Sequence, residues 1–178
     1  MAVIRMWAAA ILALTPAITF GQQAADLMKQ IVNDPGAPEV NGAKASLVSD
    51  SKVQGGKALR VAVANKGANP WDSTVGGAIK KPIANGDHLL LVFSARLAKG
   101  DGGATTATLP YNAVQLVAAP YSTVMSGTAE IGPEWKDFQI TGTSNGNYKA
   151  GDLKVTFQLA TAKQTVDFGP IVVLDRGK

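Results

Sequence analysis

The segment that most constrains the fold is residues 153–159, which alternates apolar and polar side chains throughout. The apolar positions are Leu153, Val155, Phe157 and Leu159, and the polar ones are Lys154, Thr156 and Gln158. Successive side chains of a strand point to opposite faces. The alternation therefore predicts a strand with one buried and one exposed face.

Five further segments also have the character of strands and are separated by turn signals; one of them, residues 87–97, is nearly all apolar and predicts a central strand. These segments are residues 57–64, 87–97, 112–117, 135–141 and 166–175. Turns rich in Gly and Asn lie between them, at residues 54–56, 85–87, 100–103 and 145–147. Gly169-Pro170 interrupts the last segment and predicts a β-bulge. Many short strands punctuated in this way predict an all-β, antiparallel β-sandwich or jelly roll.

The first 21 residues have the pattern of a secretory signal peptide. Arg5 supplies the positive charge, residues 6–14 form a short apolar run, and Gly21 is a small residue at a suitable cleavage position. We therefore expect a secreted or periplasmic protein. No other apolar run approaches the length of a membrane span.

Residues 22–32 have the spacing of a short helix. Ala24, Leu27, Met28 and Ile31 share one face, and residues 33–36 contain the Pro and Gly that end it. We predict a helical arm and linker over residues 22–42, and one β-sandwich domain over residues 43–178. The helix either packs on that domain or projects as an arm.

Composition excludes several function classes. The formal net charge is +4, but the charges are scattered and Lys80-Lys81 is the only adjacent basic pair. This does not predict a nucleic-acid partner, which needs a basic stripe along the phosphates. The absence of Cys excludes disulfides and thiolate metal sites. Nothing in the pattern indicates an oligomeric state.

No catalytic constellation is evident. His88 is the only His and has no recognisable nucleophile or carboxylate partner, so we assign it a structural role. Glu130 and Glu134 flank a Gly-Pro turn and could pair as glycosidase carboxylates do, an alternative that stays open.

Aromatic and amide side chains suggest a binding face instead. Tyr121 ends one predicted strand and Gln158 lies on the polar face of another. A planar ring covers the C–H face of a sugar, and an amide both donates to and accepts from hydroxyls. Trp71, in a turn, is either a stacking platform or a plug at the end of the sandwich. We interpret Trp135 as a structural lid.

Between residues 57 and 175 the sequence resembles the family 4/9-type carbohydrate-binding modules, the jelly-roll modules attached to cellulases and xylanases. The matching segments, in the order of the family, are residues 57–61, 69–72, 93–96, 119–121, 134–136 and 155–159. The resemblance implies a galactose-binding-like jelly roll with two facing antiparallel sheets. It also implies a cleft on the concave face that binds one glucan or xylan chain.

The resemblance places Tyr121 and Gln158 at positions of ligand contact. Strand parity adds Arg96 and Gln115, and we expect Trp71 at the rim. Val117 and Ala118 stand where the best-known cellulose binders have polar residues, so the glycan is not specified.

The family also has an Asp pair in its last strand that helps hold a structural calcium. Here Gly169-Pro170 occupies that place. We therefore expect no cofactor, and structural calcium stays an alternative.

Taken together, we expect an exported, non-catalytic carbohydrate-binding protein that holds a polysaccharide or cell-surface glycan. Two alternatives remain. One is a periplasmic or matrix scaffold that has the fold without a ligand, and the other is a small glycan-active enzyme.

Overall fold

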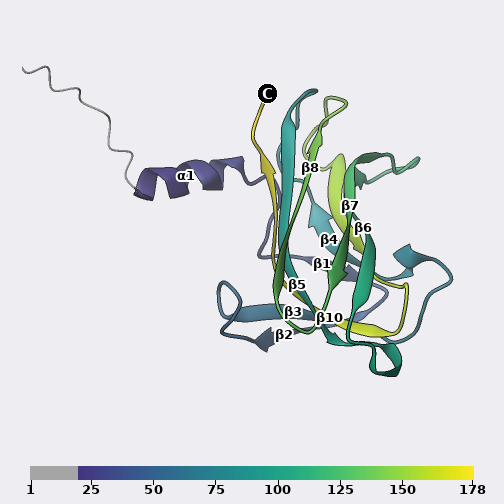
Figure 1. Cartoon of the computed structure of the whole chain (residues 1–178). Coiled ribbons are helices and arrows are strands. Elements are labelled where there is room, and N and C mark those ends of the chain that lie inside the picture. The colour runs from purple at the N-terminus through teal and green to yellow at the C-terminus, as the bar shows by residue number, and fades with distance from the viewer. Residues whose placement is uncertain (1–19) are drawn as a thin grey trace, which may run out of the picture.

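Two five-stranded antiparallel sheets pack face to face in the computed structural model, which describes residues 20–178 (Figure 1). One sheet has the order β1-β4-β9-β6-β7 and the other the order β2-β3-β10-β5-β8. The strands of the first are β1 (Glu39–Asn41), β4 (Thr74–Ala78), β9 (Leu153–Gln158), β6 (Ala107–Leu116) and β7 (Thr123–Ile131). Those of the second are β2 (Lys44–Ser49), β3 (Lys57–Val63), β10 (Gln164–Asp175), β5 (His88–Lys99) and β8 (Lys136–Thr143). The predicted antiparallel β-sandwich is confirmed.

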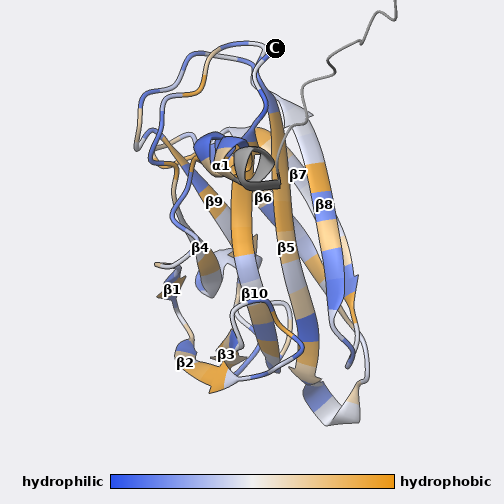
Figure 2. Cartoon of the chain, turned by 90° about the vertical axis from the view of Figure 1, so that its left-hand side faces the viewer, coloured by the Kyte–Doolittle hydropathy of each residue, from blue (hydrophilic) through white to orange (hydrophobic). Residues whose placement is uncertain are grey.

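The predicted strand faces are also confirmed. Leu89, Leu91, Phe93 and Ala95 of β5 are buried, as are Leu153, Val155 and Phe157 of β9. These side chains meet in one core between the sheets. Figure 2 shows the hydrophobic stretches along the central strands β5 and β10.

The bulge in β10 is real and is held by a residue outside the strand. The pairing of β10 with β5 shifts register between Phe168 and Ile171, across Gly169-Pro170. The Asn33 side chain bonds to the backbone just after the bulge: its amide donates to the Ile171 carbonyl (2.9 Å) and accepts from the Val173 N–H (2.8 Å).

The segment 31–33 joins the two sheets. The Val32 N–H donates to the Val173 carbonyl of β10 (2.9 Å), and the Val32 carbonyl accepts from the Lys80 N–H, just beyond β4 (2.6 Å). This segment and β1 lie within residues 22–42, which we had expected to be arm and linker. The chain therefore enters the sandwich before residue 43.

The helix α1 (Phe20–Gln30) projects from the sandwich (Figure 1). Leu27 and Met28 are 50% and 69% exposed, so the apolar face does not pack on the domain. No helix in residues 20–178 has the length and apolarity needed to cross a membrane. The expected signal peptide lies outside the described residues, apart from its last two positions.

Candidate functional site

The outer face of the β1-β4-β9-β6-β7 sheet carries a groove of about 640 Å³. Its lining comes from four strands, a short 3₁₀ helix and one turn. The lining residues are Asn41, Trp71, Thr74, Tyr111, Gln115, Tyr121, Lys154, Thr156 and Gln158.

The floor follows β9, whose outward side chains are Lys154, Thr156 and Gln158. On β4, Ala78 and Gly76 pair with Lys154 and Thr156, and on β6 Ala113 pairs with Thr156. Because these neighbours are small, the sheet surface is hollow beside the polar row of β9.

Trp71 stands at the end of the groove beside the last residues of β9. It belongs to the 3₁₀ helix η1 (Pro70–Asp72), which is fastened by the Asp72 carboxylate accepting from the Asn69 N–H (2.9 Å). Gly42 packs so closely against this helix that a Cβ there would lie 1.8 Å from the Asp72 carbonyl oxygen. The Trp71 side chain is 60% exposed. It is therefore an accessible ring and does not plug the sandwich.

Tyr121 stands at the other end. It lies in the turn between β6 and β7 and has a φ of 59°, a backbone conformation that residues other than Gly rarely adopt. Tyr121 is 56% exposed, and the Lys154 ammonium lies 6.0 Å from the centroid of its ring. Lys154, beside Tyr121, and Gln158, near the Trp71 end of the groove, are four residues apart on one strand and therefore about 13 Å apart along β9.

Between the two rings lie amides with unused hydrogen-bonding capacity. Gln115 is 8% exposed on the floor, and Gln158 is half-buried. Within residues 25–178, neither amide group hydrogen-bonds to another protein group. Tyr111 forms part of the wall, where its hydroxyl and that of Thr123 are 2.6 Å apart. The groove thus offers rings for stacking and amides for hydroxyl recognition.

Four of the five residues singled out in the sequence come together here: Tyr121, Gln158, Trp71 and Gln115. Five lining residues were not predicted from the sequence: Asn41, Thr74, Tyr111, Lys154 and Thr156. Lys154 and Thr156 were recognised as outward-facing, and their parity with Gln158 was sufficient to include them. Tyr111 was missed because β6 begins at Ala107, before the predicted start at residue 112.

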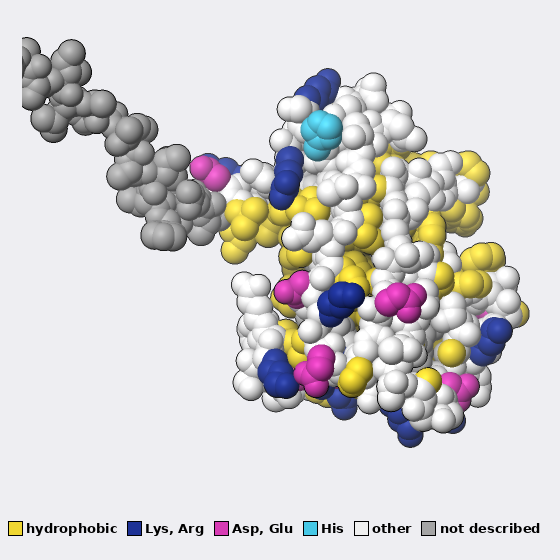
Figure 3. Space-filling view, viewed as in Figure 1, with side chains coloured by type: hydrophobic (Ala, Val, Ile, Leu, Met, Phe, Trp, Pro, Cys, Tyr) yellow, Lys and Arg dark blue, Asp and Glu magenta, His cyan; other side chains and the backbone are white. Residues whose placement is uncertain are grey.

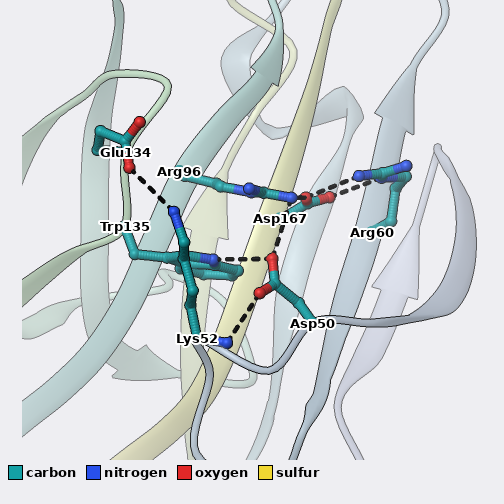
Figure 4. Close-up of polar contacts among 7 residues, drawn as sticks. All are labelled: Asp50, Lys52, Arg60, Arg96, Glu134, Trp135 and Asp167. Atoms are coloured by element: carbon teal, nitrogen blue, oxygen red, sulfur yellow. Dashed lines mark hydrogen bonds and ion pairs between the residues drawn. The ribbon is translucent and has the colours of Figure 1, made fainter.

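Arg96 does not lie in the groove, contrary to the expectation from strand parity. It projects from the outer face of β5, in the other sheet, where it contacts Asp167 of β10 (Nη2 to Oδ2, 2.9 Å). Asp167 is fully buried, and its two oxygens also accept from Arg60 of β3 at 2.7 and 2.8 Å (Figure 4). The alternation of side chains along the strand showed that Arg96 faces outward, but it could not show which of the two sheets the strand belongs to.

Asp50 and Trp135 complete this cluster. Asp50 Oδ2 accepts from the Trp135 indole N–H (3.0 Å) and lies 3.2 Å from the Arg96 guanidinium, which stacks over the indole (Figure 4). The hydrogen bond from the Lys52 backbone N–H, followed by that from the indole, lowers the pKa of Asp50. Because the donors and acceptors satisfy one another, the cluster fastens the loop after β2. Trp135 is therefore structural, and it lies with Arg96 on the outer face of the sheet.

The carboxylates considered for catalysis lie outside the groove. Glu130 of β7 accepts from the Thr108 hydroxyl (2.6 Å), and Glu134 is 3.6 Å from the Lys52 ammonium. His88, at the start of β5, contacts the Thr143 hydroxyl (3.3 Å). Neither carboxylate belongs to the groove lining.

In the described part of the chain, no three His, Asp or Glu side chains cluster so as to hold a metal ion. Gly169-Pro170, at the place where the resemblance implies a calcium-binding Asp pair, forms the β10 bulge and offers no carboxylate. Asp175 and Asp87 do lie together, and burial, reinforced by Asp87, raises the pKa of Asp175.

Solved structures with the same fold include several carbohydrate-binding modules. A CBM4 module matches with a TM-score of 0.63 and 19% identity, over 80% of this chain and 96% of that one. The N-terminal cellulose-binding domain of Cellulomonas fimi β-1,4-glucanase C matches with a TM-score of 0.58 and 20% identity, covering 83% and 93%. The CBM22-1 xylan-binding domain of Paenibacillus barcinonensis Xyn10C has a TM-score of 0.58 and 11% identity, covering 80% and 87%.

At these identities the matches establish the fold, and the structural resemblance to carbohydrate-binding modules is confirmed. No family model matches the sequence, and no curated protein matches it.

Proposed function

We propose that this protein is an exported, non-catalytic carbohydrate-binding protein that holds a polysaccharide or cell-surface glycan in the groove along β9. The observation that carries the proposal is the pair of exposed rings, Trp71 and Tyr121, at the two ends of a polar floor. The cellulose-binding and xylan-binding domains that share the fold support it.

The chemistry of the groove suits a sugar chain. Stacking on an exposed ring removes sugar C–H surface and ring surface from water together, which is favourable. The Gln115 and Gln158 amides, with the Thr74 and Thr156 hydroxyls, can donate to and accept from sugar hydroxyls. Each such bond replaces one to water, so its net contribution is small, about 0.5–1.5 kcal/mol. The rings therefore supply most of the affinity.

A binding role without catalysis agrees with the lining of the groove. Most glycoside hydrolases place two carboxyl groups beside the scissile bond. Lys154 is the only charged residue of the lining, and Glu130 and Glu134 are engaged elsewhere. Export follows from the signal peptide predicted for residues 1–21, and it would place the groove where polysaccharides are found.

Affinity electrophoresis tests the proposal. The protein without residues 1–21 is run through native gels that contain cellulosic glucan, xylan or bacterial exopolysaccharide. The double variant Trp71→Ala/Tyr121→Ala is run beside it, and circular dichroism shows whether that variant keeps the β-sandwich. Retardation of the wild type by at least one polymer, lost in the folded double variant, is the expected result. If no polymer retards the wild type, the fold serves as a scaffold and the proposal is wrong. If the double variant is retarded equally, the polymer binds elsewhere and the groove is not the site.

A further inference from the structure

The groove contains a single charged side chain. Lys154 is the only residue of its lining that carries a formal charge at neutral pH. Elsewhere on the domain, opposite charges lie close together: Figure 3 shows basic and acidic side chains interspersed on the face that it displays. The groove is therefore a local positive site, although the net charge of the chain is only +4.

The Lys154 ammonium has no anionic partner in the described part of the chain. Arg60, Arg96, Lys29 and Lys52 each lie within 4 Å of a carboxylate oxygen, whereas Lys154, like most of the described lysines, does not. The nearest carboxylate along the chain, Asp152, instead accepts a hydrogen bond from the Lys149 backbone N–H (2.7 Å). The ammonium is thus available to a ligand in the groove.

The backbone of Lys154 is held within the sheet. It lies in the middle of the sheet, between Ala78 of β4 and Gln115 of β6, and its side chain is half-buried. The Tyr121 ring is 6.0 Å from the ammonium. A sugar stacked on that ring would therefore bring its substituents to the ammonium. Partial burial restricts the lysine side chain, and a restricted side chain loses less conformational entropy on pairing with an anion than a freely moving one.

We propose that the groove is specific for an acidic polysaccharide, in which Lys154 pairs with the carboxylate of a uronic acid residue stacked on Tyr121. This inference rests on the proposed function, because it names the class of glycan bound at the same site. A charge-assisted hydrogen bond between ammonium and carboxylate, partly shielded by the groove, makes the acidic polymer bind about three- to ten-fold more tightly than its neutral counterpart.

The test compares polymers that differ only in charge. Affinity gels contain polygalacturonate, alginate or hyaluronan, each beside the same polymer after its carboxyl groups have been reduced to primary alcohols. Four proteins are run: the wild type, Lys154→Met, Lys154→Arg and Lys57→Met. Met retains the length and apolar character of the lysine side chain without its charge. Lys57→Met is the matched control, because it removes the same charge from the exposed start of β3 in the other sheet.

The wild type should be retarded more by at least one acidic polymer than by its reduced form. Lys154→Met should lose that difference, whereas Lys154→Arg and Lys57→Met should keep it. Raising NaCl from about 20 to 500 mM should also remove it, since salt screens charge pairs.

Each contrary result has a distinct meaning. If neutral polymers retard the wild type as strongly as acidic ones, or if Lys154→Met keeps the difference, the groove binds glycans but the acidic specificity is wrong. If Lys57→Met loses the difference as Lys154→Met does, the effect is one of overall charge and the inference is wrong. If no polymer, acidic or neutral, retards the wild type, the proposed function fails together with the inference.

Discussion

The rings of Phe93 and Phe157 meet edge to face between the two sheets, with their centroids 4.7 Å apart. Phe93 comes from β5, the strand next to the edge of one sheet, and Phe157 from β9 at the centre of the other. Phe157 also meets Phe168 of β10 edge to face, at 5.4 Å. The strand whose outer face forms the groove floor is thus anchored through its inner face.

Phe157→Ala should destabilise the domain by about 3–5 kcal/mol, because it removes a fully buried ring and leaves a cavity between the sheets. Urea unfolding measures the loss. Phe138→Ala is the control: Phe138 also stacks on Phe93 but is only half-buried, so its loss should be smaller. A loss below about 1 kcal/mol for Phe157→Ala would show that the ring is not in the core.

Arg96→Met should destabilise the domain without weakening glycan binding. Removing one partner of a buried ion pair costs about 3–5 kcal/mol, and we expect the lower end because Arg60 still holds Asp167. Urea unfolding and affinity electrophoresis, done on the same preparation, give the two readouts. Reduced retardation of the folded variant would mean that Arg96 contributes to the site after all.

The fold could be predicted from the strands whose two faces differ in polarity. β9 alternates because one face packs in the core and the other points outward, and β5 is recognisable as a long, nearly continuous apolar segment that starts after a turn. β4 escaped prediction because Gly76-Gly77 gives it no pattern, and its pairing with β9 is a tertiary effect. β2 is an exposed edge strand with little core contact, so no alternation marks it.

The site was predictable only in part, for a similar reason. Period-2 alternation shows which side chains of a strand share a face, which places Lys154, Thr156 and Gln158 together. It does not show which sheet a strand joins, so Arg96 could not be separated from Gln115. Asn41 and Thr74 reach the groove because β1 pairs with β4 and β4 with β9, contacts that no local pattern reveals.

Asp50→Asn should destabilise the domain at neutral pH, and the effect should fade on acidification. The Lys52 N–H and the Trp135 indole favour the charged form and lower the pKa of Asp50 from 3.8. A lowered folded-state pKa contributes stability above the unfolded value, and this is lost as the pH falls through the folded value. Thermal unfolding of wild type and variant between about pH 2.5 and 7 measures the difference. A difference in Tm that does not vary with pH would contradict this origin.

Asp175→Asn should have the opposite effect. Burial, followed by the neighbouring Asp87, raises the folded-state pKa of Asp175 above 3.8. The favourable contribution of a raised pKa is present below the unfolded value and is lost as the pH rises through the folded value. At neutral pH the carboxylate is held charged against its preference, so the neutral amide should raise Tm. Asn can still accept the hydrogen bond from the Gly177 N–H, now made to Asp175 Oδ1 (2.9 Å). The gain should shrink in acid, and a lower Tm at every pH would contradict the assignment.

Tyr121 should contribute to glycan binding through its ring while its positive φ lowers the stability of the domain. Its φ of 59° costs a residue with a Cβ about 1–2 kcal/mol, and Gly nothing. Tyr121→Ala and Tyr121→Gly both remove the ring, so each should weaken glycan binding by about 1–2 kcal/mol, more than Gln158→Ala at about 0.5–1.5 kcal/mol.

The relative stability of the Tyr121→Gly and Tyr121→Ala variants should be the reverse of that at an ordinary site, or the two should be equal. At an ordinary site Gly is less stable than Ala by about 0.5–1 kcal/mol, but here Gly should equal or exceed Ala. Urea unfolding and affinity electrophoresis of the three variants measure both effects. A Gly variant less stable than the Ala variant would show that residue 121 does not adopt the left-handed conformation, and unchanged retardation of both would remove the ring from the site.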